Sequence, residues 1–256
     1  MDPTLLAHHT STTFDELDGV QVALFPTGAT EQHGPALPLG MDFLAADAVA
    51  GAVERDDTLV LPPVPVGVSE HHRGFPGSLY VDPSTFEDYV HDTLASLASH
   101  GVRKAVVVNG HGGNDDALER AARRLRAEGT AFAVPWNWWA NLGDLHAELF
   151  GRESLGHAGA AETSVIHHVD PDLVREDRLD AAEVGTGGDD ESLTPSGAAP
   201  PWDFADLSES GTTGHPADWS PEAGERLFDA AVADLDALVD WLVARPLDDL
   251  LTPGGR

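Results

Sequence analysis

The stretch TGATEQHGPALPLGMD, residues 27–42, directly follows the apolar run VQVALF and decides how this chain is built. The run at residues 20–25 is typical of a buried strand, and the glycines and prolines after it are typical of a loop. That loop carries Glu31, His33 and Asp42. Two carboxylates and a histidine are costly to bury unless a partner compensates them. The stretch therefore predicts a binding site at the end of the first strand.

A second polar motif, GHGGN at residues 110–114, follows a second apolar run, RKAVVVN at residues 103–109. The next segment, DDALERAARRLRAEG, repeats apolar residues at helical spacing. Residues 130–134 predict a third strand, which the aromatic stretch PWNWW follows. Because strands alternate with helices, we predict an α/β fold with a mostly parallel sheet covered on both faces. Ligands bind beyond the carboxyl ends of such strands, so both polar motifs are expected at one edge.

The remaining segments fit the same plan. LVLPPVPVG at residues 59–67 predicts an edge strand, because proline cannot donate to a β-ladder. Asp42 is expected to cap the helix that follows it. We expect helices at residues 43–55, 83–101, 158–169 and 221–244, and a long surface loop at residues 183–220. The length fits a single domain over residues 1–256.

The composition argues against several classes of protein. There is no apolar run of about 18 residues, no leader typical of a signal peptide and no cysteine, so we expect a cytoplasmic protein without disulfides. Asp and Glu number 44 against 14 Lys and Arg, and the net charge is -30. Such a surface repels nucleic acids and anionic membranes. We interpret it as an adaptation to high salt, with an acidic binding face as the alternative.

The polar candidates have the chemistry of a transition-metal site. Imidazole and carboxylate groups suit Zn²⁺, Mn²⁺ or Fe²⁺, whereas Ca²⁺ prefers oxygen ligands alone. Glu31 and His33 are two residues apart, so they point the same way in an extended segment. Asp42 can fold back towards them, and His111 arrives from another strand end between glycines. So many ligands suit two ions with a shared carboxylate. The full candidate set is Glu31, His33, Asp42, His111, His157 and Glu162.

Each motif also has an ordinary structural explanation. Glu31 and His33 can form a surface hydrogen-bonding pair, and GHGGN can be a helix entry capped by Asn114. His157 can be a loop histidine, and Glu162 a first-turn carboxylate favoured by the helix dipole. Their occurrence together at predicted strand ends favours the metal site.

Three motifs, GATEQHGPALPLGMD, VVVNGHGGN and HAGAAETS, together resemble the creatininase family of metal-dependent amidohydrolases over about residues 15–245. The resemblance implies a three-layer α/β/α sandwich, a homohexamer, and two divalent ions at the carboxyl edge of the sheet. It also implies that Glu31, Asp42 and His111 hold one ion. His33 and Asp42 then hold the other, with Asp42 bridging.

The resemblance is incomplete at one ligand. Creatinine hydrolases carry a glutamate two residues after the strand-end histidine, where this chain has Gly113. We expect Glu162 to replace it. His157 resembles the family's catalytic histidine. A water between two cations loses its proton easily, and the hydroxide attacks the amide carbonyl. His157 is then placed to protonate the leaving nitrogen, while Glu162 can instead be a base that holds the water or His157.

The substrate is expected to be a small molecule with a non-peptide C–N bond, either a cyclic amide or a formamide. The family motifs also resemble archaeal deformylases of a formylamino-pyrimidine nucleotide, which is the alternative, and a branch that cleaves a modified precursor peptide. Trp139 and its neighbours can cover a flat substrate or lie in the core or a subunit interface. His71, His72 and the arginine after them can form a lid or a solvated loop. The predicted substrate contacts are Trp136, Trp138 and Arg73.

A function of a different class is also compatible with these motifs, namely a metal-dependent assembly subunit without catalysis. The metal stoichiometry separates the two. Two ions per chain favour hydrolysis, and none favours a purely structural protein.

Overall fold

Runs of Val, Leu and Ala form a parallel sheet in the computed structural model, which describes residues 4–151, 156–185 and 200–254. The strands are β1 (Val22–Thr27), β2 (Thr58–Val60), β3 (Lys104–Asn109) and β4 (Phe132–Asn137), in the spatial order β2-β1-β3-β4. All three pairings are parallel, and β2 lies at an edge, as the prolines that follow it predict. The predicted parallel sheet is therefore confirmed.

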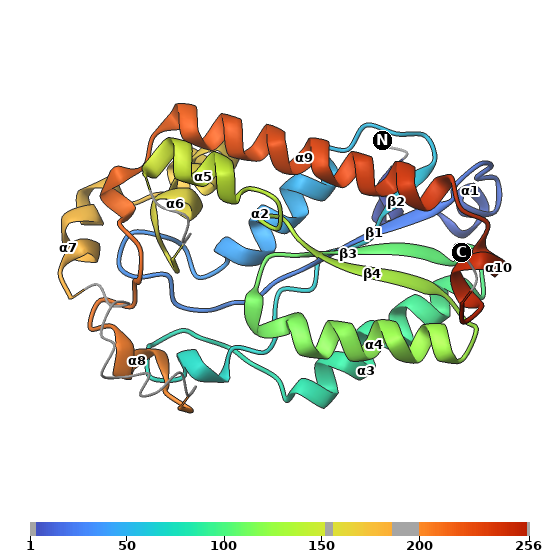
Figure 1. Ribbon diagram of the computed structural model, residues 1–256, viewed down its shortest axis with the longest axis horizontal. Helices are drawn as coiled ribbons and strands as arrows, with labels where there is room; N and C mark the ends of the chain where they lie inside the picture. The colour runs from blue at the N-terminus through green and yellow to red at the C-terminus, as the bar shows by residue number, and fades with distance from the viewer. Residues whose placement is uncertain (1–3, 152–155, 186–199, 255–256) are drawn as a thin grey trace.

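Helices cover both faces of the sheet and complete the predicted three-layer α/β/α sandwich (Figure 1). Val106 and Val108 of β3 face one apolar cluster, and Ala105 and Val107 face the other, as the two-residue period of a strand requires. The first cluster packs against α2 (Met41–Gly51), α6 (Ala160–Val169) and α9 (Pro221–Val243), and the second against α3 (Pro83–Ala98) and α4 (Asp115–Ala127).

Shorter helices occupy the connections. They are η1 (Leu6–His8), α1 (Ser11–Asp15), η2 (Glu70–His72), η3 (Gly112–Asn114), α5 (Gly143–Phe150), η4 (Pro171–Leu173), η5 (Glu176–Arg178), α7 (Leu179–Glu183), α8 (Phe204–Leu207), η8 (Pro216–Asp218) and α10 (Leu247–Leu251). Among the helices that the structure describes, none combines the length and hydropathy needed to cross a membrane.

Two strands extend beyond their predicted ends. β1 continues through Pro26, because the Pro26 carbonyl accepts a hydrogen bond from Val64 on the side where β2 has already ended. The missing N–H of Pro26 therefore interrupts no ladder. β4 includes Trp136, which we had expected after the strand, because the ladder with β3 runs on to the pairing of Asn109 with Asn137.

Two further expectations are wrong in detail. Asp42 does not cap α2, since the helix begins at Met41 and Asp42 lies in its first turn with its carboxylate turned to the histidines described below. The segment at residues 183–220 is not simply a surface loop, because Ser208 and Thr212 are buried. Residues 186–199 of that segment lie outside the described part of the chain.

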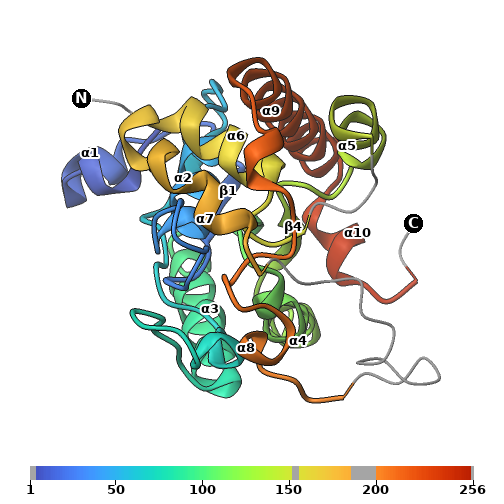
Figure 2. The same ribbon diagram turned by 90° about the vertical axis from the view of Figure 1, so that its left-hand side faces the viewer.

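The strand order places a topological switch point between β1 and β3. From β1 the chain crosses to β2 on one side, and then to β3 on the other side of β1. The carboxyl ends of β1 and β3 thus diverge into connections on opposite sides of the sheet, and this arrangement opens a crevice in parallel α/β folds. Figure 2 looks onto this end of the molecule.

Candidate metal centre

Close backbone approach brings the start of α2 against the strand ends. A Cβ atom on Gly110 would lie 2.1 Å from the Asp42 carbonyl oxygen, and a Cβ atom on Gly28 would lie 2.4 Å from the Phe43 amide nitrogen. Any larger residue at either position would displace the helix. The two glycines therefore allow Asp42 to reach the loop after β1.

The Glu31 carboxylate is buried without a hydrogen bond. Its side chain is 1% exposed, and neither oxygen forms a hydrogen bond of acceptable geometry with a described residue. Three histidine nitrogens surround its Oε1 atom: Nδ1 of His111 at 3.2 Å, Nε2 of His72 at 3.4 Å and Nδ1 of His157 at 3.8 Å. A buried carboxylate whose oxygens accept no hydrogen bond of acceptable geometry is suited to hold a cation.

Asp42 lies between two histidines. Its Oδ1 atom is 3.0 Å from Nε2 of His33, and its Oδ2 atom is 3.3 Å from Nδ1 of His111. One carboxylate thus offers one oxygen to each histidine, which is the arrangement that a ligand shared by two ions needs.

Both of these histidines present a lone pair to the carboxylates. The Nδ1–H of His33 donates to the Glu31 carbonyl at 3.3 Å, and the Nε2–H of His111 donates to the Val68 carbonyl at 3.0 Å. The other nitrogen of each ring then faces carboxylate oxygens. An imidazole fixed in this way by a carbonyl on its far side is typical of a metal ligand. The residues present therefore fit a divalent ion.

Without an ion, protons hold this cluster together. Burial alone would lower the pKa of His33, but the Asp42 carboxylate raises that pKa to about 10. Burial likewise disfavours the charged form of His111, yet Glu31 and Asp42 raise its pKa well above the ordinary value. Burial raises the pKa values of both carboxylates, and the histidines lower them by more. A metal ion would compete with protons for the same lone pairs.

Glu162 approaches from the first turn of α6. Its Oε2 atom lies 3.8 Å from Nε2 of His33 and accepts a hydrogen bond from the amide of Ala158. Ala158 has a φ of 54°, a left-handed conformation that is strained for alanine and that this hydrogen bond helps to hold. Burial raises the pKa of Glu162 to about 7. Glu162 can therefore carry a proton or an ion near neutral pH.

Gln32 determines the tautomers of His157 and His72. Its Oε1 atom accepts from the amide of Gly34, so its Nε2 atom is the donor, to the Gly211 carbonyl at 2.9 Å and to Nδ1 of His72 at 2.9 Å. Nε2 of His157 lies 2.8 Å from the Gln32 carbonyl and must donate to it. Consequently Nδ1 of His157 carries no proton in the neutral ring, whereas Nε2 of His72 does. Burial lowers the pKa of His157 to about 3, which keeps the ring neutral.

The structure thus brings together all six predicted ligands and catalytic groups. Sequence reasoning missed Gln32, although it stands between Glu31 and His33, because glutamine neither titrates nor suits a transition metal. His72 was expected in a lid or a solvated loop. It is instead buried against Glu31, and Phe204 of α8 stacks on its ring at 4.6 Å between centroids.

A cavity of about 320 Å³ opens onto the cluster. Trp138 and Trp139 form part of its wall, but Trp136 does not and lies in the first apolar cluster. Arg73 also lies outside the wall, since its guanidinium pairs with Asp203 and Glu70. The residues that line the cavity are Glu31, Asp42, His71, His72, Gly110, His111, Gly112, Trp138, Trp139, Gly156, His157, Glu162, Phe204 and Thr213.

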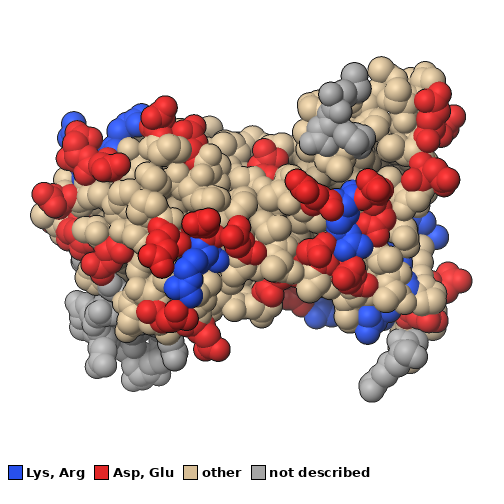
Figure 3. Space-filling model, turned by 90° about the horizontal axis from the view of Figure 1, so that it is seen from above, with Lys and Arg blue, Asp and Glu red and all other residues tan. Residues whose placement is uncertain are grey.

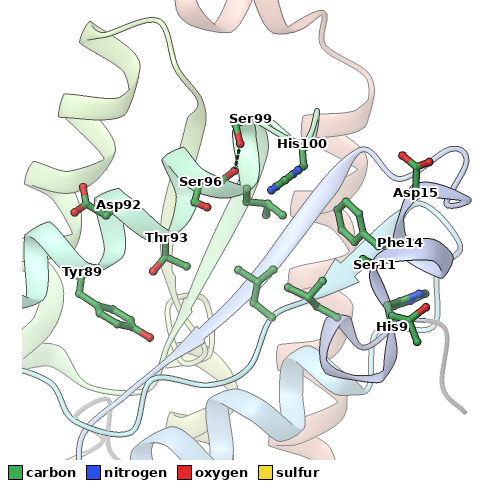
Figure 4. Close-up of a pocket in the computed structure, with 14 residues that line it drawn as sticks. His9, Ser11, Phe14, Asp15, Tyr89, Asp92, Thr93, Ser96, Ser99 and His100 are labelled. Carbon is green, nitrogen blue, oxygen red and sulfur yellow. Dashed lines mark hydrogen bonds between the residues drawn. The ribbon is translucent and has the colours of Figure 1, made fainter.

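A larger cavity of about 1070 Å³ lies elsewhere, between the N-terminal segment and α3 (Figure 4). His100 and Phe14, which line it, precede β3 and β1, so it lies at the amino ends of the strands. None of the predicted site residues lines it. Size alone therefore does not identify the reactive site of this fold, whereas the position at the carboxyl edge does.

Comparison with known sequences supports the chemistry of the cluster. Residues 7–239 match the family Creatininase, described as creatinine amidohydrolase. The mycofactocin precursor peptide peptidase of Mycolicibacterium smegmatis is 37% identical over 217 residues, which span 82% of this chain and 80% of that protein. The creatinine amidohydrolase of Pseudomonas putida is 33% identical over 176 residues, which span 62% of this chain and 68% of that protein.

Solved structures agree with these sequence matches. A mutant creatininase of Zn–Zn type has a TM-score of 0.79 and 25% sequence identity, and the match covers 96% of this chain and all 100% of that chain. A manganese form of creatininase has a TM-score of 0.78 and 25% identity, with 94% of this chain and 99% of that chain covered. Similar folds therefore carry zinc or manganese.

Proposed function

The chain belongs to the creatininase family and is a metal-dependent amidohydrolase, and from this premise we propose that Asp42 is shared by two divalent ions. The observation that carries the proposal is the pair of histidine lone pairs that face the buried carboxylates of Glu31 and Asp42. Three of the four oxygens of these carboxylates, both of Glu31 and Oδ2 of Asp42, have no hydrogen bond to a described residue. Zinc and manganese are the preferred ions, with iron as a third possibility on ligand chemistry. The proposed ligands are Glu31, His33, Asp42, His111 and Glu162.

The side chains around the ions perform the proton transfers. When bound, the ions supply an acidified water and polarise the amide carbonyl. His157 offers an unprotonated Nδ1 atom beside Glu31, so it can accept a proton and return it to the departing nitrogen. Glu162, with its pKa raised to about 7 by burial, is the second group able to hold a proton there.

The walls of the cavity restrict the substrate. No lysine or arginine is among the described residues that line it, so no permanently cationic side chain is available there to a phosphate group. The nucleotide deformylase alternative is therefore disfavoured. We propose that the amide belongs to a precursor peptide, because the 37% identical relative is named for that substrate. A cyclic amide is the second candidate, since Trp138 and Trp139 provide flat apolar walls.

The metal centre is tested by exchanging one carboxylate for its amide. Asp42→Asn should weaken the binding of both ions, at least as much as the 10- to 100-fold loss typical of more distant partners. Asp47→Asn, on the same helix but outside the cavity, is the matched control and should bind both ions normally. Isothermal titration with Zn²⁺ and Mn²⁺ measures the affinities. Unchanged affinity for two ions in Asp42→Asn would show that no ligand is shared.

The substrate is tested on the metal-loaded protein with three amides. These are a modified mycofactocin precursor peptide, creatinine and a formylamino-pyrimidine nucleotide, each followed by mass spectrometry. Cleavage of the peptide alone supports the first candidate, and opening of creatinine alone supports the second. Deformylation of the nucleotide would contradict both.

The family resemblance also leads us to propose a homohexamer and a single domain over the whole chain. From the charge of -30 we propose a cytoplasm rich in salt as the working environment. The oligomeric state is measured by light scattering, and a monomer at working salt would contradict the hexamer.

A further inference from the structure

His71 lines the cavity, and its ring forms no hydrogen bond or ion pair with a described residue. It is half-buried in η2. One of its nitrogens belongs to a group of ligand atoms, with those of Glu31 and His111, that all lie within 4.8 Å of one another. Its ring stacks on that of His111, with 5.6 Å between centroids and 12° between planes. The geometry thus places a nitrogen of His71 beside the ligand atoms of Glu31 and His111.

Position 113 cannot provide that donor. A Cβ atom on Gly113 would lie 2.3 Å from Nε2 of His111 and 2.4 Å from the Val68 carbonyl oxygen. It would also lie 3.0 Å from Cε1 of His71. Any side chain at position 113 would therefore collide with groups that already occupy the space. In this chain His71 fills the region that a side chain from position 113 would enter.

The neighbouring histidine is not equivalent. Nδ1 of His72 accepts a hydrogen bond from Gln32, so its Nε2 atom carries the proton and that N–H faces Glu31. A protonated nitrogen cannot bind a metal ion. Of these two adjacent histidines, only His71 has both ring nitrogens free of hydrogen bonds to described residues.

We propose that His71 is a metal ligand, which holds one ion together with Glu31 and His111. The other ion then lies among His33, Asp42 and Glu162, whose ligand atoms also lie within 4.8 Å of one another. Each ion thus receives a set of three donors. Asp42 also connects the two sets, because its Oδ2 atom lies 3.3 Å from Nδ1 of His111. This inference rests on the proposed two-ion centre and adds a ligand from a different segment of the chain.

The test begins with the unaltered protein loaded with zinc. X-ray absorption at the zinc edge counts imidazole ligands, and three histidines over two ions give about 1.5 imidazoles per zinc. A value of about 1.0 would leave only His33 and His111 as ligands and would overturn the proposal. This measurement needs no variant, so it does not depend on how a substitution folds.

Variants then assign the ligand to its position. His71→Asn should lower the affinity for one of the two zinc ions by at least 10- to 100-fold in a chelator competition. The number of imidazoles per zinc should fall to about 1.0. His71→Glu should keep both ions, because a carboxylate replaces the imidazole. His72→Asn is the matched control in the same turn, and both ions should remain. Circular dichroism verifies the fold of each variant.

The outcomes separate this inference from the proposed function. If the unaltered protein binds no ion, the two-ion centre and the role of His71 are both wrong. If it binds two ions and folded His71→Asn binds them equally well, only the role of His71 is wrong. If His72→Asn loses an ion while His71→Asn does not, the ligand is His72 and the tautomer assigned through Gln32 is wrong.

Discussion

Gln32 connects three parts of the site through one amide group. Its side chain holds Nδ1 of His72, the Gly211 carbonyl and, through Oε1, the amide of Gly34. A Cβ atom on Gly211 would lie only 1.9 Å from the Gln32 Oε1 atom, so the later loop can close over the amide only with glycine there. The tautomers of the reactive histidines therefore depend on packing between segments far apart in sequence.

His157 allows a prediction that separates proton transfer from metal binding. His157→Ala should keep the fold and both ions but lose about 10²- to 10⁴-fold in turnover, which is typical for removal of a general acid–base group. Turnover is measured on whichever of the three candidate amides the protein cleaves, and the metal content by mass spectrometry. A parallel loss of metal would make His157 a ligand, since its Nδ1 atom is only 3.8 Å from Glu31. Unchanged turnover would move the proton transfer to Glu162.

At the scale of elements, the exposed ion pair between Arg73 and Asp203 joins η2 to the residue before α8. The pair lies next to Phe204, whose ring contacts those of His72 and His157, so it can hold one wall of the cavity in place. The sequence suggested a substrate contact for Arg73, and its position now suggests a positioning role. A substrate contact and a positioning role for Arg73 predict different effects when Asp203 is replaced.

Arg73→Ala should raise KM by roughly two- to five-fold, the effect of losing one exposed ion pair. If the arginine acts through α8, Asp203→Ala should give the same change, and the double variant should add nothing further. Steady-state kinetics on the three variants decides the matter. An effect of Arg73→Ala that Asp203→Ala does not reproduce would restore a direct substrate contact.

His91 provides a prediction about pH and the packing of α3 against α4. Burial lowers its pKa, but hydrogen bonds to Asp92 at 2.9 Å and Glu128 at 2.8 Å outweigh this and raise the pKa. Because the folded pKa exceeds the unfolded value, the stabilisation is fully present below the unfolded pKa of about 6.5 and is lost as pH rises through the folded pKa. His91→Gln should therefore lower Tm more at about pH 6 than at about pH 9. An equal loss of Tm at both values would show that the charge contributes nothing.

Much of this architecture follows from local sequence, and the remainder depends on tertiary contacts. Runs such as residues 105–108 are β-branched or small throughout, so strand propensity and burial agree there. Glycines beside polar residues marked both strand ends. The prediction that β1 ends before Pro26 is wrong, because the missing N–H of Pro26 lies on the side where the short β2 has already ended. That position is a tertiary feature with no local signal in the sequence. The burial of Thr212 had no local signal, since it arises from packing against α7 and the loop of Gln32.

At the scale of the whole molecule, acidic side chains spread over the face formed by α9, with basic side chains in a few small groups among them (Figure 3). The chain has one lysine, Lys104, and its ammonium group donates to carbonyls at the end of α9 rather than to a carboxylate. Acidic residues number 44 and basic residues 14, so basic side chains cannot balance most of the negative charge.

We expect the fold or the assembly to fail as salt falls from about 1 M to about 0.05 M. The Debye length grows from about 3 Å to more than 10 Å over that range, so carboxylates begin to repel one another across the surface. Circular dichroism and hydrodynamic size are measured at each concentration, with sucrose at equal osmolarity as the control for non-ionic effects. Constant values of both across the series would contradict salt adaptation.

Prolines at the margins of the sheet have a consequence for solubility in brine. Phe132 and Trp138 donate to β3, so the nitrogen of Pro135 faces away from the sheet along the open side of β4. Pro62, just after β2, faces outward at the opposite margin by the same alternation, since Leu61 donates to β1. Concentrated salt removes the charge repulsion that normally prevents aggregation. Salt does not restore a missing backbone N–H. A strand from another molecule therefore still lacks hydrogen-bond donors at these prolines, which opposes edge-to-edge pairing of sheets.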